Sequence, residues 1–156
     1  MEKVLKIITF GVRNRHVAFP ASEVREIADS SGKLKPLFYS RGGAVKGVME
    51  YEGEMISILD TPNLLDVQVP GSEQFILICR PKDSEHSVGI TISSVFGMEM
   101  VETNGLKHSS DEEANYTLGY FKDASGEKER VVTVLNLTKF LEYANAKIKK
   151  FENKNV

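Results

Sequence analysis

Short runs of β-branched and other apolar residues, separated by turn signals, recur along most of this 156-residue chain. The pattern predicts strands at residues 4–10, 16–19, 24–28, 47–51, 55–59, 75–80, 88–92, 95–101, 116–121 and 130–135. Two longer polar segments, residues 29–43 and 102–115, are predicted to be irregular. Many short strands at regular intervals indicate an all-β protein of the barrel or sandwich class.

Two helical segments are predicted beside the strands. Residues 47–65 should form a hairpin with a tight turn at Glu52-Gly53, followed by a helical turn that Asp60 caps and Thr61-Pro62 begins. Residues 137–152 should form a longer helix, with its start capped by Asn136 or Thr138. Its apolar residues follow helical spacing, and we expect them to close the core; the alternative is a partner-binding helix.

The chain contains an internal repeat. Residues 16–24 align with residues 87–95 at a constant offset of 71 positions, so that Val24 matches Val95. Residues 47–65 align with residues 119–141, with Gly47 matching Gly119 and Ile58 matching Val134. Similarity on this scale indicates two copies of one small β unit, although β-rich segments can also agree by chance.

The repeat predicts how the chain is divided. We expect a single domain over residues 1–156, with one barrel of about five strands at 11–70 and a second at 71–136. The strand at 4–10 could be shared by both barrels, and the helix at 137–152 follows them. Each barrel is too small to bury a large core alone, so the two should share an apolar seam.

Composition limits the classes of partner and the compartment. The formal net charge is −2 with lysines and arginines spread along the chain, which argues against the basic stripe that nucleic-acid backbones demand. The single cysteine, Cys79, excludes a disulfide within the chain and fits a reducing compartment. No signal peptide and no apolar run near the roughly 20 residues of a membrane span are recognised, so we expect a cytoplasmic protein.

The sequence offers little catalytic chemistry. His16, His86 and His108 lie in three separate segments, and we expect surface histidines with no metal site. Cys79 lies in an apolar run and is predicted to be a buried hydrophobe; a nucleophile would need exposure and a neighbouring base. Because no phosphate loop, HExxH or GxSxG motif occurs, we expect a binding protein without cofactors and without enzymatic activity.

The order and spacing of these segments resemble the CheW-like family, the adaptor domain of bacterial chemotaxis. The resemblance covers about residues 4–142 and is carried by segments 24–27, 45–48, 53–60, 75–79, 88–90, 95–101, 116–119 and 134–137. It implies two pseudo-symmetric five-stranded barrels of the Src-homology-3-like kind with a C-terminal helix. It also implies a non-catalytic adaptor that links the cytoplasmic tips of methyl-accepting chemoreceptors to the regulatory domain of a CheA-type histidine kinase.

The resemblance also implies where partners bind. In the family, the receptor tip lies in an apolar groove between the barrels, and the matching residues here are Val24, Ile27, Val45, Val48 and Met49. Several of these could instead belong to the core. The family usually has an arginine before the turn glycine, whereas this chain has Glu52 before Gly53, and we expect Glu52 at the rim of the site. The alternative function is a small nucleic-acid-binding β-barrel, which requires basic and aromatic residues on one sheet face.

Reversing the charge at Glu52 tests this assignment. We expect Glu52→Arg to change the affinity for the partner while the free energy of unfolding stays within about 0.5 kcal/mol, as at other surface sites. Thermal unfolding and a binding titration measure the two quantities. A large loss of stability would show instead that Glu52 has a structural role.

Overall fold

The structure, a computed structural model, describes the backbone of residues 3–30, 35–41, 43–108, 110–124, 126 and 128–154, and the side chains of these except 35–41, 112 and 151–154. Its strands are β1 (Val4–Val12), β2 (Arg15–Pro20), β3 (Val24–Asp29), β4 (Lys35–Arg41), β5 (Val45–Tyr51), β6 (Glu54–Leu59), β7 (Phe75–Cys79), β8 (Val88–Ile92), β9 (Ser94–Glu102), β10 (Thr117–Asp123) and β11 (Arg130–Leu135). The helices are α1 (Thr61–Leu64) and α2 (Leu137–Lys154), with 3-10 turns η1 (Ala21–Glu23), η2 (Thr103–Gly105) and η3 (Glu112–Asn115).

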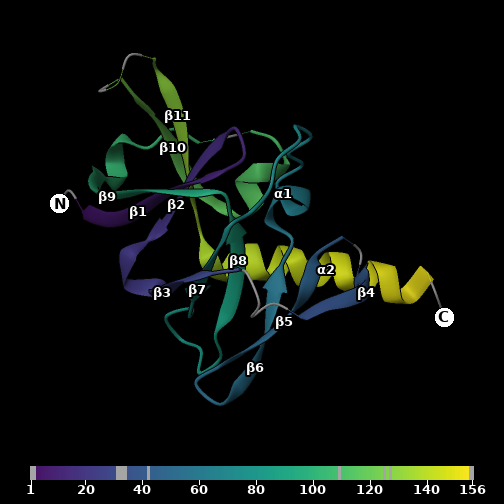
Figure 1. The fold of residues 1–156 in the computed structure, drawn as a ribbon. Helices are drawn as coiled ribbons and strands as arrows, with labels where there is room; N and C mark the ends of the chain where they lie inside the picture. Colours follow the sequence, from purple (N-terminus) through teal and green to yellow (C-terminus); the bar gives the residue numbers. More distant parts are fainter. Residues whose placement is uncertain are drawn as a thin grey trace.

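The strands form two sheets (Figure 1). Sheet 1 has the order β10-β11-β2-β1-β9, and sheet 2 has the order β3-β7-β8-β6-β5-β4. If β4 is left out and sheet 2 is read from its other end, its order is β5-β6-β8-β7-β3. The counterparts of these strands in the other copy are β10, β11, β2, β1 and β9, which is the order of sheet 1. The expected pair of pseudo-symmetric five-stranded units with a C-terminal helix is therefore confirmed, with β4 added at one edge.

The division of the chain at residues 70 and 71 differs from this arrangement. β1 and β2, from the first half, lie in one sheet with β9, β10 and β11 of the second half. Conversely, β7 and β8 lie within the sheet built from β3 to β6. The two halves thus exchange their first two strands, so that β1 pairs with β9 and β7 pairs with β3. Barrels at 11–70 and 71–136 are wrong as structural units, because each sheet draws strands from both halves.

The register of the ladders confirms the repeat. Each sheet has one parallel pair, at which strands from the two copies meet: Val134 of β11 lies opposite Ala18 of β2, and Ile58 of β6 lies opposite Gly89 of β8. These four residues are the ones that the sequence alignment pairs between copies. A Cβ on Gly89 would lie 2.3 Å from Cδ1 of Ile58, so the close approach of these strands depends on a glycine there.

The predicted strands and helices are observed, with ends that differ by at most two residues; β1, for example, continues to Val12. The two segments expected to be irregular contain further structure. The segment 29–43 contains β4; the side chains of its apolar residues lie outside the described ones. The segment 102–115 contains η2 and η3. Its Lys107 forms an isolated β-bridge with Tyr120 of β10. In the other copy, Lys35 of β4 pairs with Val48 of β5 in a similar way.

Each sheet curls around a small apolar cluster of its own. In sheet 2, Ala28 of β3 and Met49 of β5 share a cluster although three strands separate β3 from β5 in the sheet order. In sheet 1, Val101 of β9 and Phe121 of β10 pack on one cluster from opposite ends of the sheet. Strands so far apart in a sheet can pack on one small cluster only if the sheet bends round on itself, as a barrel does.

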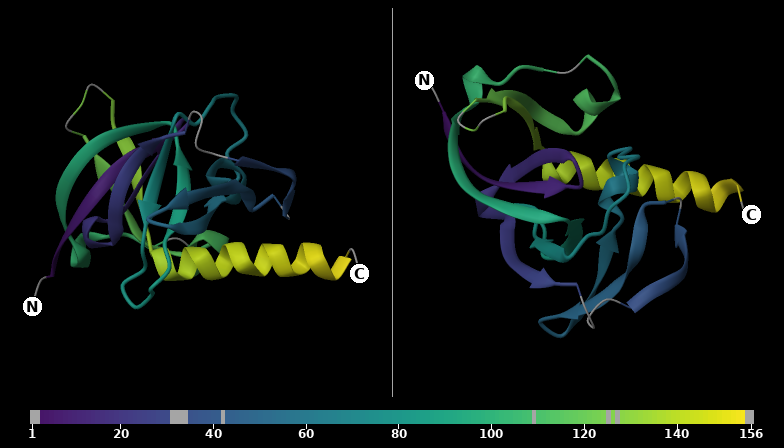
Figure 2. Two further views of the ribbon diagram at one scale, coloured as in Figure 1. Left: turned by 60° about the horizontal axis from the view of Figure 1, so that its bottom comes forward. Right: turned by 45° about the horizontal axis from the view of Figure 1, so that its top comes forward.

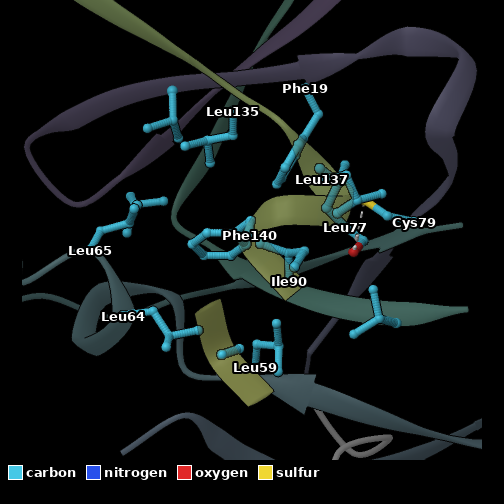
Figure 3. Packing of buried hydrophobic residues seen from close by; sticks show 14 of the residues in the cluster. Phe19, Leu59, Leu64, Leu65, Leu77, Cys79, Ile90, Leu135, Leu137 and Phe140 are labelled. Atoms are coloured by element: carbon cyan, nitrogen blue, oxygen red, sulfur yellow. Dashed lines mark hydrogen bonds between the residues drawn. The ribbon is translucent and has the colours of Figure 1, made fainter. Parts of the chain in front are cut away.

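The largest apolar cluster lies between the sheets and is closed by α2. Phe140 is fully buried, with its ring centroid 6.2 Å from that of Phe19 and 5.6 Å from that of Tyr116. In Figure 3 it points from α2 into the space among side chains of both sheets, Leu135 and Ile90 included. α2 runs along one side of both sheets and extends past them at its C-terminal end (Figure 2). These contacts agree with the expectation that the helix closes the core.

Both helix starts are capped as predicted. The backbone N–H of Asn63 donates to the carboxylate of Asp60 at the start of α1, at 3.4 Å. The backbone N–H of Lys139 donates to Oδ1 of Asn136 at the start of α2, at 3.2 Å. Each cap follows directly on the last strand of its copy, β6 or β11, so the same strand-to-helix turn is built twice.

Removing the ring of Phe140 tests the role of α2 in the core. We expect Phe140→Ala to lower the free energy of unfolding by about 3–5 kcal/mol, because the cavity would lie between the two sheets. Lys139→Ala, on the exposed side of the same helix turn, should change it by less than about 0.5 kcal/mol. Chemical denaturation measures both, and equal small effects would contradict the packing described.

Candidate functional site

The edge strand β9 carries an unusual row of exposed apolar side chains. It is the last strand of sheet 1, so one side of its backbone has no neighbouring strand. Met98 and Met100 are 60% and 64% exposed. Long apolar edge strands are templates for association, and soluble proteins usually shield them with charges or cover them. The row therefore marks a candidate surface for binding another protein.

The exposed row continues onto β1. Ile8 lies directly opposite Met98 in the ladder, and Lys6 lies opposite Met100. Residues directly opposite in an antiparallel pair share one face of the sheet. The other face points inward, where Ile7 is buried in the cluster of sheet 1. Met98, Met100 and Ile8 thus form one continuous outward surface.

This surface ends in a groove at the seam between the sheets, on the side where β1, β3 and β9 lie in Figure 1. The groove is formed where the chain passes from β2 through η1 into β3, and so crosses from sheet 1 to sheet 2. Its volume is about 570 Å³. It is lined by Leu5, Lys6, Ile8, Ala21, Ser22, Val24 and Met98. We call this the seam groove.

The repeat relates the two strands that flank the seam groove. Val24 and Ile27 of β3 correspond to Val95 and Met98 of β9 at the offset of 71 positions. The ladders agree, because Ile27 lies opposite Leu77 as Met98 lies opposite Ile8. Ile27 is 42% exposed. β3 and β9 therefore present related apolar side chains on the edge of each sheet.

The residues predicted to bind a partner do not gather on one surface. Val24 lines the seam groove, and Ile27 is exposed on the same strand. Val45 is buried in the core between the sheets, and Met49 is buried within sheet 2. Val48 is half-buried on β5. The alternative that some of these residues are core residues holds for Val45 and Met49.

Glu52 and Gly53 lie at a different hollow, at the open end of sheet 2. This hollow has a volume of about 560 Å³ and is lined by Glu26, Ala28, Met49, Glu50, Tyr51, Glu52 and Ile78. Its floor is apolar and its rim carries three carboxylates. Partial burial, reinforced by the charges of Glu52 and Glu26, raises the pKa of the Tyr51 hydroxyl. Glu52 is thus at a rim as expected, but at the rim of this hollow rather than of the seam groove.

The turn at Glu52 has the geometry of a two-residue hairpin. Glu52 has φ of 50° and Gly53 has φ of 79°. Positive φ at both central residues is typical of a type I′ turn, which matches the twist of the flanking strands. The predicted tight turn at Glu52-Gly53 is confirmed. Glu52 adopts the left-handed conformation as well, which the sequence did not indicate because glutamate rarely does so.

The titratable groups do not form a catalytic arrangement in the described part of the chain. Burial raises the pKa of the Cys79 thiol, whose Sγ lies 3.8 Å from the carbonyl oxygen of Leu77, so the cysteine is a buried hydrophobe as predicted. His86 is exposed and lies 3.0 Å from Glu54. Among the described residues, no cluster of His, Cys, Asp or Glu could hold a metal ion. No helix of the described chain is long and apolar enough to cross a membrane.

His16 differs from the surface histidine expected. Its ring packs against Phe96, with 4.9 Å between ring centroids, and its Nδ1 atom is buried. Burial, aided by the nearby charge of Arg130, lowers the pKa of His16, while Asp123 acts in the opposite direction. The guanidinium of Arg130 lies 5.3 Å from the centre of the Phe96 ring on which it stacks. His16 therefore supports Phe96 on the inner face of sheet 1, the face opposite to Met98 and Met100.

The exposed row on β9 was not identified as a site from the sequence. Residues 95–101 were predicted as a strand, but alternation alone does not say which face meets solvent. The signal lies in Glu99, whose neighbours Met98 and Met100 must face the opposite side. Glu99 lies opposite Ile7, whose side chain is in the core, so the polar residue points inward and the methionines outward. The outward direction of the two methionines can be inferred only when β9 is known to pair with β1.

Comparisons with known proteins agree on the fold. Residues 6–145 match the family model of the CheW-like domain. Among solved structures, the chain is similar to the scaffolding protein TtCheW from Thermoanaerobacter tengcongensis, with a TM-score of 0.70 and 12% sequence identity. The alignment covers 85% of this chain and 89% of that one. A search of curated protein sequences found no match.

Proposed function

This chain belongs to the CheW-like domain family, and we propose on that premise that it is a non-catalytic adaptor linking chemoreceptors to a CheA-type histidine kinase. The observation that carries the proposal is the apolar surface formed by β9 and the seam groove. A groove of this kind suits an amphipathic helix, which lays its apolar face into it. We assign the cytoplasmic tip of a methyl-accepting chemoreceptor, a helical hairpin, to this groove.

The kinase would contact a separate part of the molecule. The regulatory domain of CheA-type kinases has the same fold in this family, and pairing of like domains needs exposed strands at the ends of a sheet. β3, the end strand of sheet 2 and the counterpart of β9 in the repeat, is such a strand in this chain. The rim of Glu26, Glu50 and Glu52 lies at the end of sheet 2 and should set the charge that this partner must carry. We place the protein in the cytoplasm, where both partners are found.

The nucleic-acid alternative has less support. Binding to a single strand relies on aromatic side chains surrounded by cations. Tyr51, the aromatic residue at the open end of sheet 2, lies beside Glu26, Glu50 and Glu52 instead. A phosphate backbone would be repelled from this hollow, and the net charge of −2 gives no compensating attraction elsewhere.

A charge placed in the seam groove tests the proposed function. We expect Met98→Glu to weaken binding of a receptor-tip hairpin from the same genome by at least tenfold. Burying a methionine side chain is worth about 1.5–3 kcal/mol, and a buried unpaired carboxylate costs more. Met55→Glu is the matched control, because Met55 is also exposed, at 55%, but lies on β6 away from the groove.

Fluorescence anisotropy of a labelled hairpin measures the affinity, and thermal unfolding checks that both variants remain folded. Equal effects of Met98→Glu and Met55→Glu would contradict the assignment of the groove. If the unmodified protein binds neither the hairpin nor the kinase regulatory domain, the proposed function itself is wrong.

A further inference from the structure

Two methionines stand side by side on the outward face of β9. Met98 and Met100 are 60% and 64% exposed, and residues two apart in a strand point to the same side of the sheet. Met98 also lines the seam groove. By contrast, Met49 is 3% exposed within sheet 2. The most accessible methionines of the described chain therefore lie on the surface to which we assign a partner, together with Met55 at a separate place on β6.

We propose that Met98 and Met100 form an oxidation-sensitive modification site, at which a peroxide-class oxidant weakens partner binding to the seam groove. The inference rests on the proposed function, because it concerns regulation of the same surface. Neither residue takes part in the core of sheet 1 or in the core between the sheets. Modification can thus change the surface without opening the fold.

The reaction is a two-electron oxidation of each thioether. The sulfur attacks one oxygen of the peroxide, the O–O bond breaks, and an S=O bond forms while the remaining oxygen leaves as water. Methionine sulfoxide reductases reverse the step with electrons from thiols, using one enzyme for each sulfoxide epimer. The change is therefore reversible, as a regulatory modification must be.

Oxidation changes the chemistry of the groove in the direction that opposes binding. A methionine side chain is flexible and apolar, whereas its sulfoxide is polar and chiral. A partner that lays apolar side chains against Met98 has no donor for the sulfoxide oxygen, which would be buried without a hydrogen bond. On β1, Ile8 faces Met98 directly and offers no donor from its side chain.

Of the two end strands related by the repeat, only β9 should be sensitive to oxidation. On β3, the counterparts of Met98 and Met100 are Ile27 and Asp29 at the offset of 71 positions. Neither isoleucine nor aspartate reacts with peroxides under conditions that oxidise methionine. Contacts made through β3 should therefore persist after oxidation, while those made through β9 are lost.

Peptide mapping after treatment with hydrogen peroxide tests the modification. Met98 and Met100 should convert to the sulfoxide at least about tenfold faster than Met49, because the rate follows exposure. Met55, which is 55% exposed, serves as the accessible reference within the same chain. Conversion of Met98 and Met100 no faster than Met49 would overturn the inference.

Binding of the receptor-tip hairpin before and after peroxide tests the consequence. We expect a loss of at least about tenfold in affinity, restored by treatment with the two sulfoxide reductases. In the double variant Met98→Leu/Met100→Leu, compared with its own untreated sample, peroxide should change the affinity by less than twofold. Met55→Leu, the matched control, should keep the full sensitivity.

The outcomes separate the inference from the proposed function. If the untreated protein binds the hairpin and the oxidised protein binds equally well, the inference is wrong and the adaptor function stands. If Met55→Leu removes the sensitivity and the double variant keeps it, the site is on β6 and the inference is also wrong. If the untreated protein binds neither the hairpin nor the kinase regulatory domain, the proposed function fails and the inference falls with it.

Discussion

The exchange of two strands between the halves of the chain, β1 and β2 for β7 and β8, is the constraint on which this structure depends. β7 pairs with β3 of the first half, and β1 pairs with β9 of the second. Each sheet is therefore incomplete without the other half, and the apolar cluster between the sheets draws on both. Phe140 packs against Phe19 from the first copy and Tyr116 from the second. Either half alone would expose apolar side chains that the other half covers.

The exchange also determines where the candidate site lies. The exchanged strands β7 and β8 lie between β3 and β6 in sheet 2, and β1 and β2 lie between β9 and β11 in sheet 1, so β3 and β9 become end strands. The seam groove forms at the crossing through η1, where Val24 and Met98 line it together. The order in which the strands are connected therefore produces an exposed surface for a partner. The side chains of β9 make that surface apolar. The same placement exposes Met98 and Met100 to solvent.

Local patterns predicted the elements but not their pairing. Alternation and turn residues located ten strands, and the repeat predicted the pseudo-symmetry, because both signals are local or periodic. β4 was missed because its segment is rich in turn residues. The sequence does not predict the exchange, because the apolar pattern of a strand is equally satisfied by neighbours from either half. The resemblance places Val45 and Met49 at the groove, whereas the structure buries both side chains.

Separating the chain at the middle tests the exchange most directly. Residues 1–70 and 71–156 can be produced as two chains and studied by circular dichroism and amide NMR. The account predicts that each chain alone lacks cooperative unfolding and dispersed amide signals, and that mixing equal amounts restores the spectrum of the intact protein. A fragment 1–70 that folds cooperatively by itself would contradict the exchange of β1 and β2 for β7 and β8.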